Sequence, residues 1–218
     1  LMKDGKLTEA LALFKEIRGY QDTNSIISDL ELYISAEDAG TALDQYDIYI
    51  SLGGFLDSAE RAAALAGEVY NEALELYKSG DISGAGAYFT ALGEYEDAPL
   101  YAEACSIYES ASSQGSNVSK LPRLKELSQS IDVSPVLMSN KFYTDWLIGT
   151  WYTSSGDMFQ MKSNSFIFTL MGGSGTFYFR DAAMYDGNYN LICTFSYVSY
   201  DEMIITMADG TEHHFTRS

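Results

Sequence analysis

Two different spacings of apolar residues divide the chain. In the first half, apolar positions recur at intervals of three and four, as in Leu7, Leu11, Phe14 and Ile17, and this spacing predicts amphipathic helices. From Gly149 the period falls to two, in short segments rich in aromatic and β-branched residues, which predicts strands. The pattern therefore predicts an α+β chain of two domains, with helices first and an antiparallel sheet after them.

The helical half contains an internal repeat. Segments that begin at Gly5, Gly40 and Gly80 align, at spacings of 35 and 40 residues. Each copy has an aromatic residue nine positions after the glycine, an aliphatic residue at twelve, an aromatic at fifteen and an aspartate at seventeen: Phe14, Ile17, Tyr20, Asp22; Tyr49, Leu52, Phe55, Asp57; and Phe89, Leu92, Tyr95, Asp97. We expect a helix, a tight turn and a second helix in each copy. The aspartate carboxylate is expected to cap the second helix by accepting its first amides, and Pro99 favours a helix start in the third copy.

These segments resemble tetratricopeptide repeats. The Ala10 to Phe14 and Ala85 to Phe89 spacings match the alanine and phenylalanine positions of that family, whereas the tryptophan signature is missing and aspartate stands where the family has proline. The resemblance covers residues 1 to about 115 and implies a short helical solenoid of three repeats. In that register Leu1 falls late in the first helix of a repeat, which predicts a parent chain that continues upstream.

The same resemblance predicts a partner groove on the concave side of the solenoid. It is lined by aliphatic and tyrosine residues on the first helices of two pairs: Ile27, Leu30, Ile34, Tyr70, Leu74 and Tyr77. An amphipathic peptide would fit such a surface. Stripes at this spacing are also typical of helix packing within a core, so both interpretations stay open.

Residues 116–146 are expected to form a helical linker or a degenerate capping repeat. The piece from Leu121 to Leu127 is amphipathic, and Asp132 or Ser134 can cap a helix that begins at Pro135. This assigns residues 1–115 to the helical repeats and residues 147–218 to the second domain.

The second domain is predicted to be a small antiparallel up-and-down β-barrel. Seven short segments alternate in polarity: GTWYTS, DMFQMK, SFIFTL, TFYFR, NLICTFSY, EMIITM and TEHHFTR. Turn signals separate several of them, namely Ser155-Gly156, the GGSG of residues 172–175, Asp186-Gly187 and Asp209-Gly210. Closing such a meander into a barrel removes its exposed edges.

The stretch LIGTWY, residues 147–152, resembles the first strand of lipocalin-like barrels, with Gly149 and Trp151 in the G-x-W motif. The resemblance implies that an arginine on the last strand, here Arg217, stacks over the tryptophan. It also implies an interior that takes hydrophobic small molecules. The predicted interior contains Trp151, Phe166, Phe168, Phe177, Phe179, Phe215 and Arg217, with Met203 and Ile205, and these side chains either line a ligand cavity or fill it.

The charge of the chain is strongly negative and unevenly placed. The formal net charge is −18; residues 1–115 hold 21 Asp and Glu against 6 Lys and Arg, and the rest hold 10 against 7. A field of this sign repels phosphate, so nucleic acid and anionic lipid are poor partners, whereas a cationic protein or peptide is tolerated. The excess charge is equally typical of a surface that is kept soluble, so both interpretations stay open. No apolar run in the sequence is long enough for a membrane-spanning helix.

The sequence offers no motif for catalysis, metal binding or cofactor binding. Cys105 and Cys193 are far apart, and the adjacent His213 and His214 point to opposite faces of a strand. No phosphate-binding loop, dinucleotide fingerprint or calcium loop is present. We therefore expect a non-catalytic interaction or scaffold module that needs no cofactor. The pairing of the two resemblances suggests the extracytoplasmic part of a bacterial surface protein, anchored by a segment outside this chain. The alternative is a binding protein for a small hydrophobic ligand held in the barrel.

Overall fold

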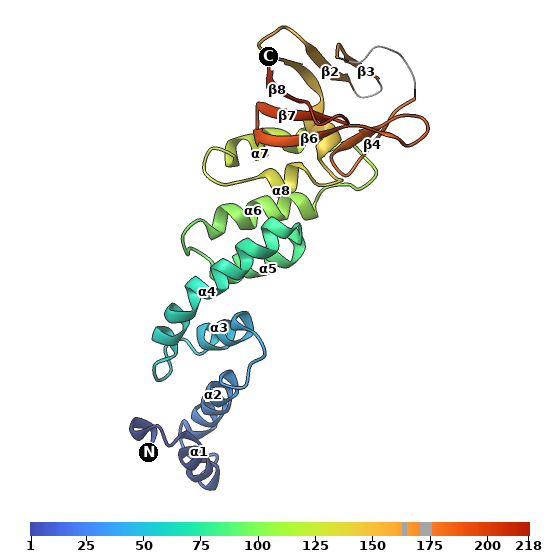
Figure 1. Ribbon diagram of the computed structural model, residues 1–218. Helices are drawn as coiled ribbons and strands as arrows, with labels where there is room; N and C mark the ends of the chain where they lie inside the picture. Colours follow the sequence, from blue (N-terminus) through green and yellow to red (C-terminus); the bar gives the residue numbers. More distant parts are fainter. Residues whose placement is uncertain (163–164, 171–175) are drawn as a thin grey trace. The chain divides into compact units, whose positions relative to one another are not determined.

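The computed structural model describes residues 1–218 except 163–164 and 171–175, and it is an α+β structure with helices before an antiparallel sheet (Figure 1). The chain forms two compact units. The first contains Leu1–Glu75 and Ala87–Pro99, and the second contains Leu76–Gly86 and Leu100–Ser218. The predicted order of helices and then strands is confirmed.

Six helices and a 3-10 turn occupy the chain up to residue 109: η1 (Met2–Asp4), α1 (Leu7–Glu16), α2 (Thr23–Ala36), α3 (Ala42–Ser51), α4 (Ser58–Ser79), α5 (Ile82–Leu92) and α6 (Ala98–Glu109). Helices α4 and α5 each contribute residues to both units. In the first unit the largest fully buried side chains include Leu30, Tyr49 and Phe89. The later helices therefore bury the apolar stripe that their spacing predicts, whereas in the α1 stripe Leu7, Leu11 and Phe14 are half-buried and Ile17 is exposed.

The turns after α1, α3 and α5 share one backbone geometry. In each, the second aromatic residue (Tyr20, Phe55, Tyr95) donates its amide to the carbonyl of the aliphatic residue three positions earlier, at 3.0–3.2 Å. Its own carbonyl accepts from the residue three positions later, at 3.0–3.2 Å. The residue after the aromatic, Gln21, Leu56 or Glu96, has a positive φ of 45–54° in all three turns. The aligned sequence positions therefore have equivalent conformations.

The three aspartates stand where the prediction puts them, but two of their carboxylates act differently from the expected caps. Helices α2, α4 and α6 begin directly after Asp22, Asp57 and Asp97, and Pro99 is the second residue of α6. The side chain of Asp22 makes no capping hydrogen bond. The carboxylate of Asp57 instead accepts from the Tyr33 hydroxyl and from Arg61. The Arg61 guanidinium, one turn further along α4, is charged and is therefore a stronger donor than the free amides of the first turn.

Residues 116–146 are helical, in short pieces that belong to the second unit. They form η2 (Val118–Lys120), α7 (Leu121–Leu127), α8 (Ser134–Leu137) and α9 (Tyr143–Leu147). Asp132 accepts from the Ser134 amide at 2.8 Å, at the start of α8. Leu124, Leu137 and Trp146 are fully buried, so these helices share the core of the second unit.

Eight antiparallel strands form one sheet in the order β3-β2-β1-β8-β7-β6-β5-β4. They are β1 (Gly149–Tyr152), β2 (Met158–Lys162), β3 (Ser165–Phe168), β4 (Tyr178–Arg180), β5 (Ala183–Tyr185), β6 (Leu191–Ser199), β7 (Glu202–Met207) and β8 (Glu212–Arg217). The turns at Ser155-Gly156, Asp186-Gly187 and Asp209-Gly210 join strands as predicted, and the GGSG of 172–175 lies outside the described residues. Strand β5 is absent from the sequence prediction.

The sheet is a curled half-barrel, so the prediction of a closed barrel is wrong. Its two end strands are β3 and β4, and no backbone ladder joins them in the described part of the chain. Side chains meet across this opening instead: the ring centroids of Phe166 on β3 and Phe179 on β4 are 5.6 Å apart. Strand β4 has only three residues and β3 only four, which leaves few backbone groups for a ladder.

Candidate functional site

The first unit carries most of the negative charge. It holds 18 Asp and Glu against 5 Lys and Arg, a net charge of −13. In the described residues, five of these carboxylates pair with a cation: Asp4, Glu9, Glu31, Glu37 and Asp57. The remaining acidic side chains of this unit keep their charge uncompensated, which gives the helices a surface suited to a cationic partner.

Three helices bring carboxylates together around one tyrosine. Asp44 and Asp47 stand three positions apart on α3, Glu72 lies on α4 and Tyr88 on α5. Burial and then the charges of Glu72 and Asp44 raise the pKa of Tyr88. Burial and then Asp44 raise the pKa of Asp47. Asp44 and Asp47 therefore repel each other, Glu72 and Asp44 lie near the neutral Tyr88, and in the described residues no cation pairs with the three carboxylates. We call Asp44, Asp47, Glu72 and Tyr88 the acidic patch.

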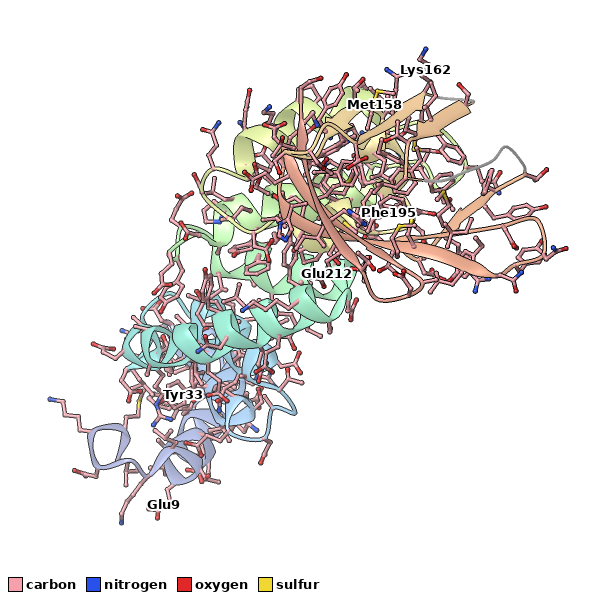
Figure 2. The ribbon with its side chains drawn as sticks, turned by 45° about the horizontal axis from the view of Figure 1, so that its top comes forward. Glu9, Tyr33, Met158, Lys162, Phe195 and Glu212 are labelled. Carbon is pink, nitrogen blue, oxygen red and sulfur yellow. The ribbon has the colours of Figure 1, made fainter. Side chains whose placement is uncertain are left out.

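The only arginine that joins several helices of the first unit is Arg61, among the described residues. Its guanidinium donates to Asp57 and, at 3.2 Å, to the Tyr49 hydroxyl, and it lies 3.6 Å from Glu37. The guanidinium carbon is 5.3 Å from the centroid of the Tyr33 ring, which Figure 2 labels. The hydrogen bond from Tyr33, and then Arg61, lower the pKa of Asp57. This cluster joins α2, α3 and α4 and leaves no reactive group free for chemistry.

The six residues predicted to line a groove are largely covered. In the first unit Ile27 and Leu30 are buried, with exposed fractions of 3% and 0%, and Ile34, Tyr70 and Leu74 are half-buried. The Tyr70 ring packs against Phe89 and Tyr95. Tyr77 belongs to the second unit, where it is buried and contacts Tyr101. These side chains pack within their own units, and a peptide groove at these positions stays a prediction.

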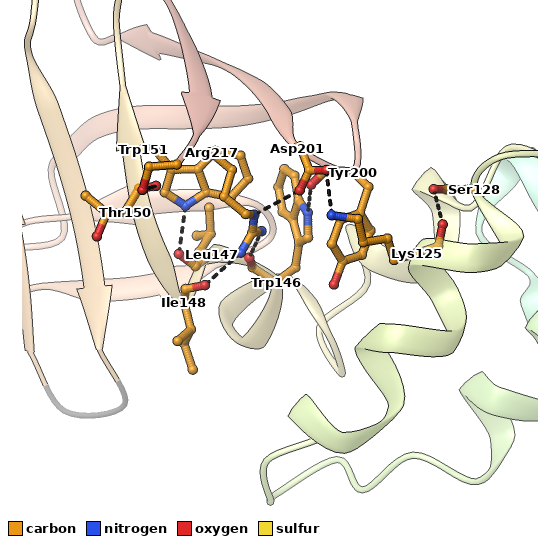
Figure 3. Close-up of polar contacts among 11 residues, drawn as sticks. Lys125, Ser128, Trp146, Leu147, Ile148, Thr150, Trp151, Tyr200, Asp201 and Arg217 are labelled. Carbon is orange, nitrogen blue, oxygen red and sulfur yellow. Dashed lines mark hydrogen bonds and ion pairs between the residues drawn. The ribbon is translucent and has the colours of Figure 1, made fainter.

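In the second unit, Arg217 on β8 connects the last strand to the first strand and to α9 (Figure 3). Its guanidinium carbon lies 4.0 Å from the centroid of the Trp151 ring. Its Nη1 donates to the Ile148 carbonyl at 2.9 Å and its Nη2 to the Trp146 carbonyl at 2.6 Å. Gly149 has a φ of 137°, and a Cβ there would lie 3.1 Å from Nη1, so only glycine fits beside the guanidinium.

Helix α9 and the neighbouring α7 are held to the same end of the sheet. Trp146 Nε1 donates to the Tyr200 carbonyl at 3.0 Å, and its ring centroid is 5.3 Å from that of Trp151. Asp201 accepts ion pairs from Lys125 of α7 at 2.7 Å and from Arg217 at 3.5 Å. The contacts of Trp146, Asp201 and Arg217 in Figure 3 join helices to the sheet, and the hydrogen bond from the Ser128 hydroxyl to the Lys125 carbonyl lies within the α7 segment. The arrangement is therefore structural.

The predicted barrel interior is filled with aromatic rings. Trp151, Phe168 and Phe215 are buried, whereas Phe166, Phe177, Phe179 and Arg217 are half-buried. Phe159 contacts Phe195, labelled in Figure 2, at 5.5 Å between centroids, although β2 and β6 are separated by three strands in the sheet. Phe166 likewise contacts Phe177 at 5.1 Å. These rings occupy space that a hydrophobic ligand would need.

A polar cavity of about 380 Å³ lies in the second unit, lined by residues of the 112–116 loop, by residues 140–148 and by Met161 and Lys162. The buried Asn117 fixes the loop: its Nδ2 donates to the Ser112 and Lys141 carbonyls, each at 2.9 Å. Asp145 accepts from the Ser116 hydroxyl and the Asn117 amide, and Lys141 donates to the Tyr108 carbonyl at 3.0 Å. Asp145 and Lys141 therefore already have partners, and the other charged residue of the lining, Lys162, is exposed.

The described residues contain no group of three His, Cys, Asp and Glu side chains that could hold a metal ion. Cys105 and Cys193 are both buried, and burial raises the pKa of each thiol to about 12. Such thiols are weak nucleophiles, because the thiolate is the reactive form. His213 is half-buried and the adjacent His214 is exposed. Within the described residues no helix is both long enough and apolar enough to cross a membrane.

Comparison of the chain with protein-family models, curated proteins and solved structures finds no match.

The acidic patch is the site that sequence reasoning missed. Carboxylates are so frequent in the helical half that no pair stands out from spacing alone. The available signal is the spacing of three between Asp44 and Asp47, which places both on one face of a helix. Glu72 and Tyr88 join them only through the packing of α3, α4 and α5.

Proposed function

We propose that this chain is a non-catalytic protein-interaction module whose helical first unit binds a cationic segment of a partner protein. The observation that carries the proposal is the uncompensated negative charge of the first unit, gathered at the acidic patch. Repulsion between Asp44 and Asp47 disfavours folding, so the patch is a poor choice for stability and a good one for attracting a cation.

We further propose that the helices are tetratricopeptide-like repeats and that the half-barrel is lipocalin-like. The shared geometry of the three turns supports the first relation, and the Arg217 guanidinium over Trp151 supports the second. From this pairing we propose that the module works on the extracytoplasmic side of a bacterial cell surface. A hydrophobic ligand in the half-barrel is the less favoured function, because the phenylalanine rings contact one another there.

Binding of a fluorescein-labelled amphipathic peptide built from lysine and leucine tests the proposal. Fluorescence anisotropy should show saturable binding to the full chain at low salt. The triple variant Asp44→Asn, Asp47→Asn, Glu72→Gln should raise the Kd about tenfold or more, because removing charges at a contact weakens association. Raising the salt concentration should weaken binding to the unmodified chain more than to this variant.

The matched control is the triple variant Asp22→Asn, Asp38→Asn, Glu94→Gln. It removes the same number of charges from exposed positions of the first unit outside the patch. We expect its Kd to change by less than about threefold. Equal losses of affinity in the two variants would show that net charge alone attracts the peptide. Absence of binding to the unmodified chain at low salt would refute the proposed function.

A further inference from the structure

The polar cavity of the second unit is lined by the only buried charged residue in the described part of the chain. This residue is Asp145 of α9, which is 9% exposed, and the volume of the cavity is about 380 Å³. No cation among the described residues forms an ion pair with its carboxylate. Buried carboxylates are normally paired, because moving a charge out of water costs free energy. A ligand that supplies hydrogen-bond donors would therefore be favoured beside Asp145.

Both carboxylate oxygens of Asp145 can accept a further hydrogen bond. One oxygen accepts from the Ser116 hydroxyl at 3.2 Å, and the other accepts from the Asn117 amide. An ionised carboxylate has about four acceptor positions, so the described residues occupy only half of them. The two bonds fix the direction of the carboxylate, and the remaining acceptor positions are available to a ligand.

The loop of residues 112–116 is held in one conformation by hydrogen bonds within the chain. Asn117 is 2% exposed, and its Nδ2 donates to the Ser112 and Lys141 carbonyls. Its Oδ1 accepts from the Ser112 amide at 2.9 Å. The Lys141 ammonium lies 4.1 Å from the centroid of the Tyr108 ring and donates to the carbonyl of the same residue. A wall that is ordered in advance loses less conformational entropy when a ligand binds.

The rest of the lining is mainly uncharged and polar. Four side chains of this kind make no hydrogen bond to another described residue: Ser113, Gln114, Asn140 and Thr144. Hydroxyl and amide groups can donate as well as accept, so this lining matches a ligand whose own groups do both. Ile148 and Met161 add apolar contacts. The charged members of the lining are of both signs, since Lys141 and Lys162 accompany Asp145.

We propose that this cavity binds a neutral sugar ring, either a free monosaccharide or the end of a glycan. Sugar hydroxyls donate to a carboxylate and also accept from amides and hydroxyls, and the C–H groups of the ring suit the contacts with Ile148 and Met161. An ammonium ligand would meet the two lysines, and an anion would meet Asp145. The volume lies in the range of about 300–1,000 Å³ that is typical of small-molecule sites. This site is separate from the acidic patch, so the inference does not depend on the proposed function.

Titration of the ¹⁵N-labelled full chain with sugars, followed by NMR, tests the proposal. The probes are D-glucose, D-galactose, N-acetyl-D-glucosamine and their methyl glycosides, which represent the end of a glycan. At least one probe should give saturable shifts of the amides of residues 112–116 and 140–148, with a Kd below about 10 mM. Binding of the methyl glycosides supports a glycan end as the ligand, and binding of the free sugars alone supports a monosaccharide.

The double variant Asn140→Leu, Thr144→Val removes two polar groups of the lining with little change in volume, and it breaks no hydrogen bond between described residues. It should raise the Kd about tenfold or more, because two hydrogen bonds to the sugar are lost. The matched control is Asn188→Leu, Thr194→Val. It makes the same changes at an exposed asparagine and a half-buried threonine outside the cavity, and should alter the Kd less than about twofold.

Three outcomes would overturn the inference. The first is the absence of saturable shifts with all six sugars up to about 100 mM. The second is an equal Kd for the two double variants. The third is tighter binding of sulfate or ethylammonium than of any sugar at the same amides, which would make the ligand charged. The NMR spectrum of each variant shows whether it is folded, so a loss of binding is not confused with unfolding.

Discussion

At the scale of single residues, Arg217 on the last strand, β8, links that strand to the adjacent first strand, β1, and to helix α9. It covers the Trp151 ring and supplies donors to the Trp146 and Ile148 carbonyls, and its side chain is only 18% exposed. Burial lowers the pKa of Arg217, whereas the nearby Tyr200 and Asp201 raise it. The charged group therefore depends on several partners at once, and its loss leaves each of them incomplete.

Replacing Arg217 with alanine should destabilise the second unit by about 2–4 kcal/mol, since two carbonyls lose charge-assisted donors and the Trp151 ring loses its covering cation. Tryptophan fluorescence during urea denaturation measures this, because Trp146 and Trp151 both lie in the second unit. Arg180→Ala is the control, because Arg180 is 77% exposed and pairs only with the adjacent Asp181. A midpoint for Arg217→Ala equal to that of the control would disprove the structural role assigned to Arg217.

At the scale of elements, the repeated turns combine a predictable and an unpredictable feature. The sequence alignment locates the three helix starts, because aspartate and proline have strong positional preferences there. It does not reveal that Gln21, Leu56 and Glu96 adopt positive φ, since none of these residues favours that conformation. It also gives the wrong partners for Asp57: Arg61 lies one turn along the helix that follows, and Tyr33 is brought close by tertiary packing.

Relieving the strain of the positive φ at one of the three turns should stabilise the first unit. Leu56 has a φ of 54° and is 40% exposed, so glycine should fit with little loss of packing and raise the free energy of unfolding by about 1 kcal/mol. Leu56→Val should lower it, because a β-branched side chain tolerates a positive φ least. Urea denaturation followed by circular dichroism at 222 nm measures both. If glycine and valine shift the midpoint in the same direction, backbone strain does not limit this turn.

In the sheet too, local sequence patterns predict some features, and tertiary packing decides the others. Seven strands follow from alternating polarity and from Gly-containing turns. Strand β5 does not, because it has three residues and follows a two-residue turn of Asp181 and Ala182, both with positive φ, in place of the usual Asn-Gly. Closure is not predictable from polarity either, since it depends on whether β3 and β4 are long enough to pair.

At the scale of the whole molecule, 31 Asp and Glu against 13 Lys and Arg imply self-repulsion, and the first unit bears −13 of the net −18. The acidic patch could be recognised only from the packed helices, because its members come from distant parts of the sequence. Repulsion of this kind acts over the Debye length, which shortens from about 30 Å at 10 mM salt to about 10 Å at 100 mM. Salt should therefore stabilise the first unit more than the second.

Thermal unfolding at these two salt concentrations tests this charge asymmetry. Tryptophan fluorescence reports on the second unit alone, whereas circular dichroism at 222 nm reports on helices of both units. Raising the salt should increase the Tm seen by circular dichroism by about 2–4 °C, as expected for about 1 kcal/mol, and increase the fluorescence Tm less. The Asp44→Asn, Asp47→Asn, Glu72→Gln variant should show a smaller increase, because three uncompensated charges of the first unit are already removed. Equal shifts by both probes would mean that the first unit's excess charge is not a determinant of its stability, since screening would then act on the two units alike.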